Sequence, residues 1–126
     1  MNADQFHMIA EKLFNELPAK FRRLMQNVVI VTEDFASAEV LASMQIESAY
    51  DLLGLYEGVP LTERQIAESG SVPDLIHLYR EPILAMQAES GESISACIRN
   101  VMVHEIGHHF GFSDAQMHAI EQESKP

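Results

Sequence analysis

The segment from residue 92 to residue 109 predicts a helix that is apolar on almost every side. The apolar residues around the helix axis are Ile94, Ile98, Val101, Met102, Val103 and Ile106. Such a helix is buried in the middle of a domain, so the rest of the chain must pack around it. His104, Glu105, His108 and His109 interrupt this apolar pattern. Because titratable groups on a buried helix are costly unless they are paired or bind a metal, these residues already indicate a metal site.

His104, Glu105 and His108 form the pattern His-Glu-x-x-His. Residues four apart lie on one face of a helix, so His104 and His108 aim two imidazoles at one point. Two neutral imidazoles suit zinc, which takes nitrogen ligands at about 2.0–2.1 Å in a tetrahedral arrangement. Glu105 lies beside the first histidine, where it can contact a water on the metal rather than the metal. This is the general-base position of a zinc hydrolase.

A catalytic zinc needs a third protein ligand and an open fourth position. The spacing offers Asp114, and Gly111 before it is suited to end the helix and reverse the chain, because glycine tolerates a positive φ. Ser113 then predicts the N-cap of a last short helix, with Gln116 completing a capping box. His118, four residues beyond Asp114, is an alternative third ligand because zinc also favours histidine.

The other segments predict a mixture of helices and strands. The expected helices are residues 3–17, 63–69 and 82–89, and the expected strands are residues 27–32, 51–56 and 74–79. Residues 35–49 are ambiguous between a helical turn and a loop. This order indicates an α+β fold, in which a small mixed sheet packs against helices around the buried helix that carries the motif.

Length and composition indicate one domain that spans residues 1–126. The net charge of −11 argues against nucleic acid and anionic membrane surfaces as partners, since like charges repel. A single cysteine excludes an internal disulfide framework, and no apolar run reaches the roughly 18 residues of a membrane span. Residues 1–7 lack the basic and apolar regions of a signal peptide, so we expect a cytoplasmic protein.

The extended motif and three other stretches resemble a known family. The motif residues that look like the signature of zincin metallopeptidases with aspartate as third ligand are His104, Glu105, His108, Gly111 and Asp114. The stretches that are similar to the small bacterial minimal zincin family, long known as a domain of unknown function, are Leu53–Leu61, Pro73–Arg80 and Val101–Gly111. The resemblance implies a compact minimal zincin-like domain with a zinc-dependent peptidase site.

We therefore expect hydrolysis of a peptide or protein substrate by a zinc-activated water, with Glu105 as the general base. An edge of strand 51–56 or strand 74–79 is expected to hold the substrate by β-addition. Tyr56 and Tyr79 are candidates to polarise the substrate carbonyl.

We expect structural roles for three other residues, His109, His77 and Cys97. His109 points about 100° around the helix from the metal face, so we expect it to pack rather than bind metal. His77 is a lone strand histidine and Cys97 a buried apolar cysteine, and we expect both to be structural.

Two rival hypotheses remain. One is a non-catalytic zinc-binding module, in which a fourth protein ligand such as His118 closes the metal site. The other is a metal-free helical interaction protein. A second wall of a peptidase cleft would be built from residues after the motif, and only residues 115–126 follow Asp114 in this sequence. We therefore expect this wall to be absent or supplied by another subunit of a homo-oligomer.

Overall fold

The computed structural model describes residues 1–25, 27–58 and 72–124 of the chain. The helix predicted at residues 63–69 lies outside these described residues. The helices of the described part are α1 (Ala3–Asn15), α2 (Ala19–Arg22), α3 (Ala38–Ser43), α5 (Arg80–Ser90), α6 (Ile94–Phe110) and α7 (Asp114–Ser124).

The sheet of the described residues has three strands, β1 (Val28–Glu33), β2 (Gly54–Glu57) and β3 (Asp74–Tyr79). β3 is the central strand, and it pairs in parallel with β1 and antiparallel with β2. This small mixed sheet among helices confirms the predicted α+β fold. β2 begins later than predicted because residues 49–51 form a 3-10 helix, whose N-cap is the Ser48 side chain.

Local caps explain where several helices begin and end. Asn2 and Gln5 form a reciprocal capping box at the start of α1. The Ser93 side chain accepts a hydrogen bond from the amide of Ala96 at the start of α6. In the ambiguous segment 35–49, Ser37 caps α3 in the same way, so part of this segment is helical. α2 and the first residues of α5 were not predicted.

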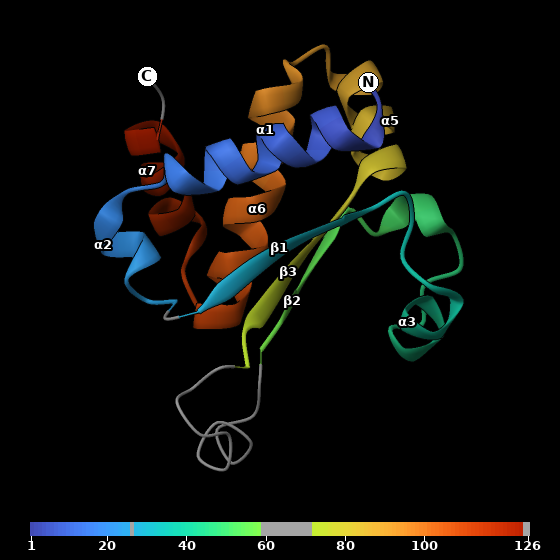
Figure 1. Ribbon diagram of the computed structural model, residues 1–126, viewed down its shortest axis with the longest axis horizontal. Coiled ribbons are helices and arrows are strands. Elements are labelled where there is room, and N and C mark those ends of the chain that lie inside the picture. The colour runs from blue at the N-terminus through green and yellow to red at the C-terminus, as the bar shows by residue number, and fades with distance from the viewer. Residues whose placement is uncertain (26, 59–71, 125–126) are drawn as a thin grey trace.

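α6 is in contact with most of the other elements of the domain. It contacts α1, α5, α7, β2 and β3, and Figure 1 shows it at the centre of these elements. Its buried residues are Cys97, Ile98, Val101, Met102, Val103, Ile106 and Gly107. Because neighbours surround α6, apolar residues are needed on most of its sides. Each fully buried Ile or Met is worth about 1.5–3 kcal/mol.

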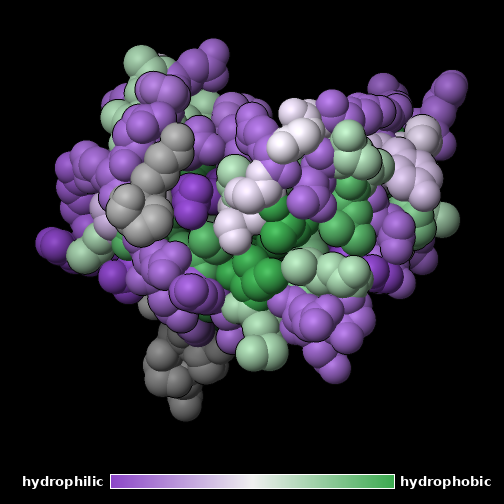
Figure 2. Space-filling model, turned by 90° about the horizontal axis from the view of Figure 1, so that it is seen from above, coloured by the Kyte–Doolittle hydropathy of each residue, from purple (hydrophilic) through white to green (hydrophobic). Residues whose placement is uncertain are grey.

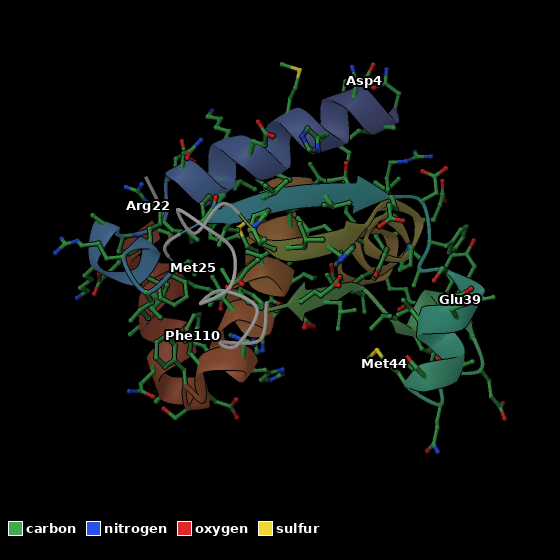
Figure 3. The ribbon with its side chains drawn as sticks, turned by 60° about the horizontal axis from the view of Figure 1, so that its bottom comes forward. Asp4, Arg22, Met25, Glu39, Met44 and Phe110 are labelled. Carbon is green, nitrogen blue, oxygen red and sulfur yellow. The ribbon has the colours of Figure 1, made fainter. Side chains whose placement is uncertain are left out.

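The motif itself is less buried than we expected. His104 and Glu105 are half-buried, and His108 and His109 are exposed. A buried position for the motif is therefore not confirmed: these side chains lie where α6 meets the surface. Phe110, at the end of α6, packs partly buried against the main hydrophobic cluster that includes Met25, and Figure 3 places both residues at the same end of the molecule.

The surface mixes polar and apolar areas. On the face shown in Figure 2, hydrophobic side chains reach the surface near the middle and hydrophilic ones surround them. None of the helices in the described residues is long and apolar enough to cross a membrane.

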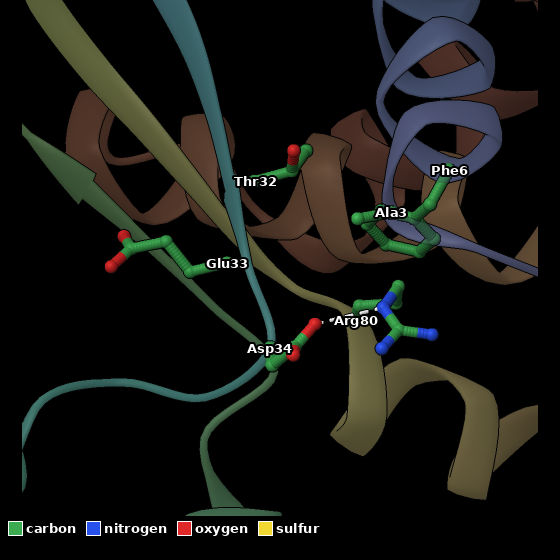
Figure 4. Close-up of a pocket in the computed structure, with 6 residues that line it drawn as sticks. All are labelled: Ala3, Phe6, Thr32, Glu33, Asp34 and Arg80. Carbon is green, nitrogen blue, oxygen red and sulfur yellow. Dashed lines mark hydrogen bonds and ion pairs between the residues drawn. The ribbon is translucent and has the colours of Figure 1, made fainter.

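Arg80 links the ends of β1 and β3 to the N-terminus of the chain. Its Nε donates to Asp34 Oδ1 at 2.8 Å, and its Nη1 donates to the Met1 carbonyl at 2.8 Å. Figure 4 shows this corner, which lies at the opposite end of β3 from Asp74. The hollow there measures about 30 Å³, which is far below the roughly 300 Å³ of a small ligand site. We therefore assign this corner a structural role.

Candidate metal centre

α6 brings His104 and His108 together as the motif predicted. Their ring centroids are 5.9 Å apart, and the ring planes are inclined by 82°. Two imidazoles bound tetrahedrally to one zinc, with Zn–N bonds of about 2.0–2.1 Å, have ring centroids about 5 Å apart. The observed separation is within an ångström of that value, so small side-chain rotations suffice. The ring separation fits two of the ligands of one zinc.

The side chain of Glu105 extends from α6 toward strand β2. A Cβ added at Gly54 would stand only 3.2 Å from Glu105 Cγ, so the strand is in close contact with this side chain. Burial raises the pKa of Glu105 above its ordinary value of 4.5, while nearby His108 acts in the opposite direction. A carboxylate in such a place takes up a proton more readily than one in water, as a proton acceptor must.

The chain turns after α6 as predicted. Gly111 adopts φ 75° and ψ 29°, the left-handed conformation that favours glycine. The amide of Phe112 donates to the Gly107 carbonyl at 2.8 Å, which closes the last turn of the helix. Ser113 and Gln116 exchange the two hydrogen bonds of a capping box, at 3.2 Å and 2.8 Å.

α7 returns antiparallel to α6 and begins with Asp114. Met117 packs against Gly107, and Asn100 donates to Glu121 Oε1 at 3.1 Å. These two contacts set the register of the helix pair.

The structure does not add a third ligand to the two histidines. Within the residues that it describes, no three His, Cys, Asp or Glu side chains are grouped closely enough to hold a metal ion. Asp114 is exposed at the first position of α7. Its role as third ligand therefore stays a prediction, and so does the alternative, His118.

His118 lies in a shallow polar groove of about 180 Å³. The groove is lined by Glu92, Ala96, Arg99, Asn100, His118, Glu121 and Gln122. These residues come from α7, the first half of α6 and the residues before it. Neither motif histidine lines this groove.

The two tyrosines are engaged within the fold. The Tyr56 hydroxyl donates to Oδ2 of the buried Asp74 at 2.5 Å. Tyr79 is buried, and burial, together with Glu33, Glu57 and Glu105, raises its pKa to about 12. Its hydroxyl therefore keeps its proton at neutral pH. The Tyr56 hydroxyl is thus engaged with Asp74, and the expectation that one of the two hydroxyls polarises a substrate carbonyl stays a prediction.

His77 and Cys97 have structural surroundings, as expected. His77 Nδ1 lies 3.1 Å from Glu33 Oε1, and its Nε2 lies 2.9 Å from Glu57 Oε1, so it links the three strands. Cys97 is 1% exposed within the core.

The sequence interpretation missed the contact between β2 and α6. His109 stacks on Tyr56, with ring centroids 4.0 Å apart and planes inclined by 21°. Gly54, Tyr56 and Gly58 alternate along the chain, and that spacing was the signal for one strand face in close contact with a helix.

Residues 25–124 match the family model described as Zincin-like metallopeptidase, and the chain belongs to this family. Membership implies zinc binding in general terms. No curated protein matches the chain. Among solved structures, the chain is similar to a conserved hypothetical protein from Thermo thermophilus. The sequences are 24% identical, the TM-score is 0.56, and the match covers 87% of this chain and 94% of the other. That likeness supports the fold alone.

Proposed function

We propose that this protein is a zinc-dependent peptidase. His104, His108 and Asp114 would bind the metal, and Glu105 would be the general base. The observation that carries the proposal is the pair of imidazoles 5.9 Å apart on α6, with Glu105 between them in the sequence. When bound, zinc acidifies a water molecule and polarises the substrate carbonyl.

Glu105 would take the proton of the attacking water and pass it to the leaving amine. Two features support this role. The side chain is half-buried against β2, which restricts its conformations. Its raised pKa, caused by burial, favours proton uptake in the metal-free chain.

The substrate would be an extended peptide on the outer edge of β2. β3 has β1 on one side and β2 on the other, so the expected use of strand 74–79 as a binding edge is wrong. No other described strand pairs with the outer edge of β2. β2 also lies in close contact with Glu105.

The sheet register identifies the backbone groups available on that edge. The amide of Tyr79 donates to the Leu53 carbonyl at 3.0 Å, so Leu53 directs its polar groups toward β3. These directions alternate along an antiparallel strand. The N–H and C=O groups of Gly54 and Tyr56 therefore point to the outer edge, where a peptide can pair with them. N-methylation of the substrate amides that pair there should raise KM while kcat changes less.

The rival proposal is a non-catalytic zinc module. In that module a fourth ligand such as His118, one turn beyond Asp114 on α7, would have to close the metal site, although His118 lines a groove that neither motif histidine lines. A catalytic zinc site keeps one position open, whereas a structural site is closed by four protein ligands. Counting protein ligands on the bound metal separates the two proposals.

The ligand set is tested by zinc content. His104→Ala or His108→Ala should abolish binding of about one zinc per chain. Asp114→Ala should weaken binding far more than His118→Ala. The opposite order would make His118 the third ligand, and full zinc occupancy in either of the first two variants would overturn the assignment.

Catalysis is tested with Glu105→Gln, which keeps the shape of the side chain but cannot take up the proton. Peptide hydrolysis by the zinc-loaded protein should fall by about 10² to 10⁴, with zinc content unchanged. A broad peptide library should first establish activity of the wild type. Equal cleavage by variant and wild type would show that a contaminant is responsible, and loss of zinc would make Glu105 structural.

The remaining expectations extend this proposal. We propose a peptide or protein substrate, no nucleic-acid or membrane partner, and association into a homo-oligomer. Mass measurement in solution, with and without peptide, tests the last of these points.

A further inference from the structure

Strand β2 and helix α6 meet along a seam of six residues. One side is Gly54 and Tyr56 of β2 with Gly58 directly after the strand, and the other side is Val101, Glu105 and His109 of α6. Four residues of strand span about 13 Å, and eight residues of helix span about 12 Å. The two sides of the seam therefore run together from Gly54 to Gly58 without losing register.

The two glycines allow this close contact. A Cβ at Gly54 would lie 2.8 Å from Val101 Cγ1 and 3.2 Å from Glu105 Cγ. A Cβ at Gly58 would lie 2.8 Å from His109 Cε1. A side chain at Gly54 would press on Val101 and Glu105, and one at Gly58 would displace the His109 ring.

Tyr56 and His109 hold the seam together between the glycines. Their rings stack at 4.0 Å, and Phe110 meets both rings edge-on, at 5.9 Å from Tyr56 and 4.9 Å from His109. The Tyr56 hydroxyl donates to the buried Asp74 carboxylate at 2.5 Å, which fixes the tyrosine ring against the sheet. His109 is an exposed residue, yet its ring has a defined place.

The seam adds a ring contact to the last turn of α6, beside the hydrogen bond from the Phe112 amide to the Gly107 carbonyl. Helix ends fray because their last carbonyls lack intrahelical partners. His109 lies one residue from the end of α6 and directly follows His108. Holding the His109 ring on β2 therefore limits the movement of the backbone that carries the second histidine and Glu105.

We propose that Tyr56 and His109 are positioning residues for the metal centre: their stack, anchored by Asp74, holds the end of α6 against β2 and thereby orients His108 and Glu105. This inference rests on the proposed function, because it assumes that His108 binds metal. Neither ring is proposed to contact metal or substrate.

The test compares His109→Ala, which removes the stack, with His109→Phe, which keeps a flat ring, and Tyr56→Phe, which removes only the hydroxyl. Tyr50→Ala is the matched control. Tyr50 packs edge-on against Phe35 at 5.1 Å, in a part of the chain outside the seam. For each variant we would measure zinc affinity by chelator competition, the visible spectrum of the cobalt-loaded protein, melting temperature, and kcat and KM for a cleaved peptide.

His109→Ala should weaken zinc binding by about tenfold, the usual cost of losing a residue that orients a metal ligand. It should also change the cobalt spectrum and lower kcat more than it raises KM. His109→Phe should recover most of the affinity, and Tyr56→Phe should lie between them. Tyr50→Ala should change only the melting temperature.

Two results overturn the inference in distinguishable ways. If the wild type binds zinc but His109→Ala matches Tyr50→Ala in affinity and cobalt spectrum, the stack is merely structural and only this inference fails. If the wild type binds no zinc or cobalt, the proposed function fails and the positioning role fails with it. The affinity and spectrum decide between these results even if no peptide is cleaved.

Discussion

Gly107 is where α6 and α7 are in closest contact, and Gly107→Ala tests whether that contact controls the metal centre. A Cβ at this position would stand 2.3 Å from Met117 Sδ and 2.6 Å from Met117 Cγ. Favourable contacts between heavy atoms lie at about 3.5–4.0 Å, so the sulfur would have to move by more than about 1 Å. Met117 is 1% exposed, which leaves its side chain little room to rotate.

The expected loss of stability is the difference of two effects. Overpacking a filled core costs about 1–3 kcal/mol, and the short distances here place the cost near the upper end. Replacing glycine by alanine inside a helix increases the free energy of unfolding by about 0.5–1 kcal/mol. The net loss is about 2 kcal/mol, which lowers the melting temperature of a domain of this size by roughly 6–12 °C.

The same change should weaken zinc binding. Met117 follows Asp114 by three residues on α7, so a helix displaced at Met117 moves the predicted third ligand as well. Calorimetric melting and chelator competition measure the two effects on one sample.

A double-mutant cycle supplies the control. Met117→Ala alone should cost about 2–5 kcal/mol because it leaves a cavity. In Gly107→Ala with Met117→Ala, the new methyl group occupies part of that cavity, so the combined loss should be smaller than the sum. Additive losses, or a single Gly107→Ala variant as stable as the wild type, would show that the two residues do not restrain each other.

Three further predictions concern Glu105, Gly111 and Gly54. Because burial raises the pKa of Glu105 above 4.5, the folded metal-free chain holds this proton more tightly than the unfolded chain. The wild type should lose stability relative to Glu105→Gln as the pH rises from 4.5 through the raised pKa, and melting with chelator at about pH 4 and about pH 7 measures this. If the melting temperature of Glu105→Gln exceeds that of the wild type by the same amount at both pH values, the raised pKa of Glu105 does not affect stability. Gly111→Val should strain the turn by about 1–3 kcal/mol and weaken zinc binding, since its φ is +75°; unchanged calorimetric affinity would argue against the turn's role. Gly54→Ala should lower the melting temperature and raise KM, because its Cβ would lie 3.0 Å from the His77 carbonyl oxygen. A wild-type KM would show that β2 does not hold the substrate.

The sequence by itself determined the features that depend on neighbours along the chain. The apolar surround of α6 follows from helical periodicity, and the pairing of His104 with His108 follows from the rise and turn of one helix. The reversal at Gly111 and the capping box of Ser113 and Gln116 are also local, because each involves residues three or four apart. The turn at Gly111 and the capping box are confirmed.

Tertiary structure decided the features that depend on segments far apart in the sequence. β3 became the central strand because Val28 pairs with Asp74 and Gly54 pairs with Leu78, and no local pattern specifies such partners. That choice removed β3 as a substrate edge and left β2 beside Glu105. The stack of Tyr56 on His109 has the same origin, because it joins two residues that are more than fifty positions apart in the chain, one on a strand and one on a helix. Side-chain packing between such elements responds to shape and volume, which the order of residues along one segment does not contain.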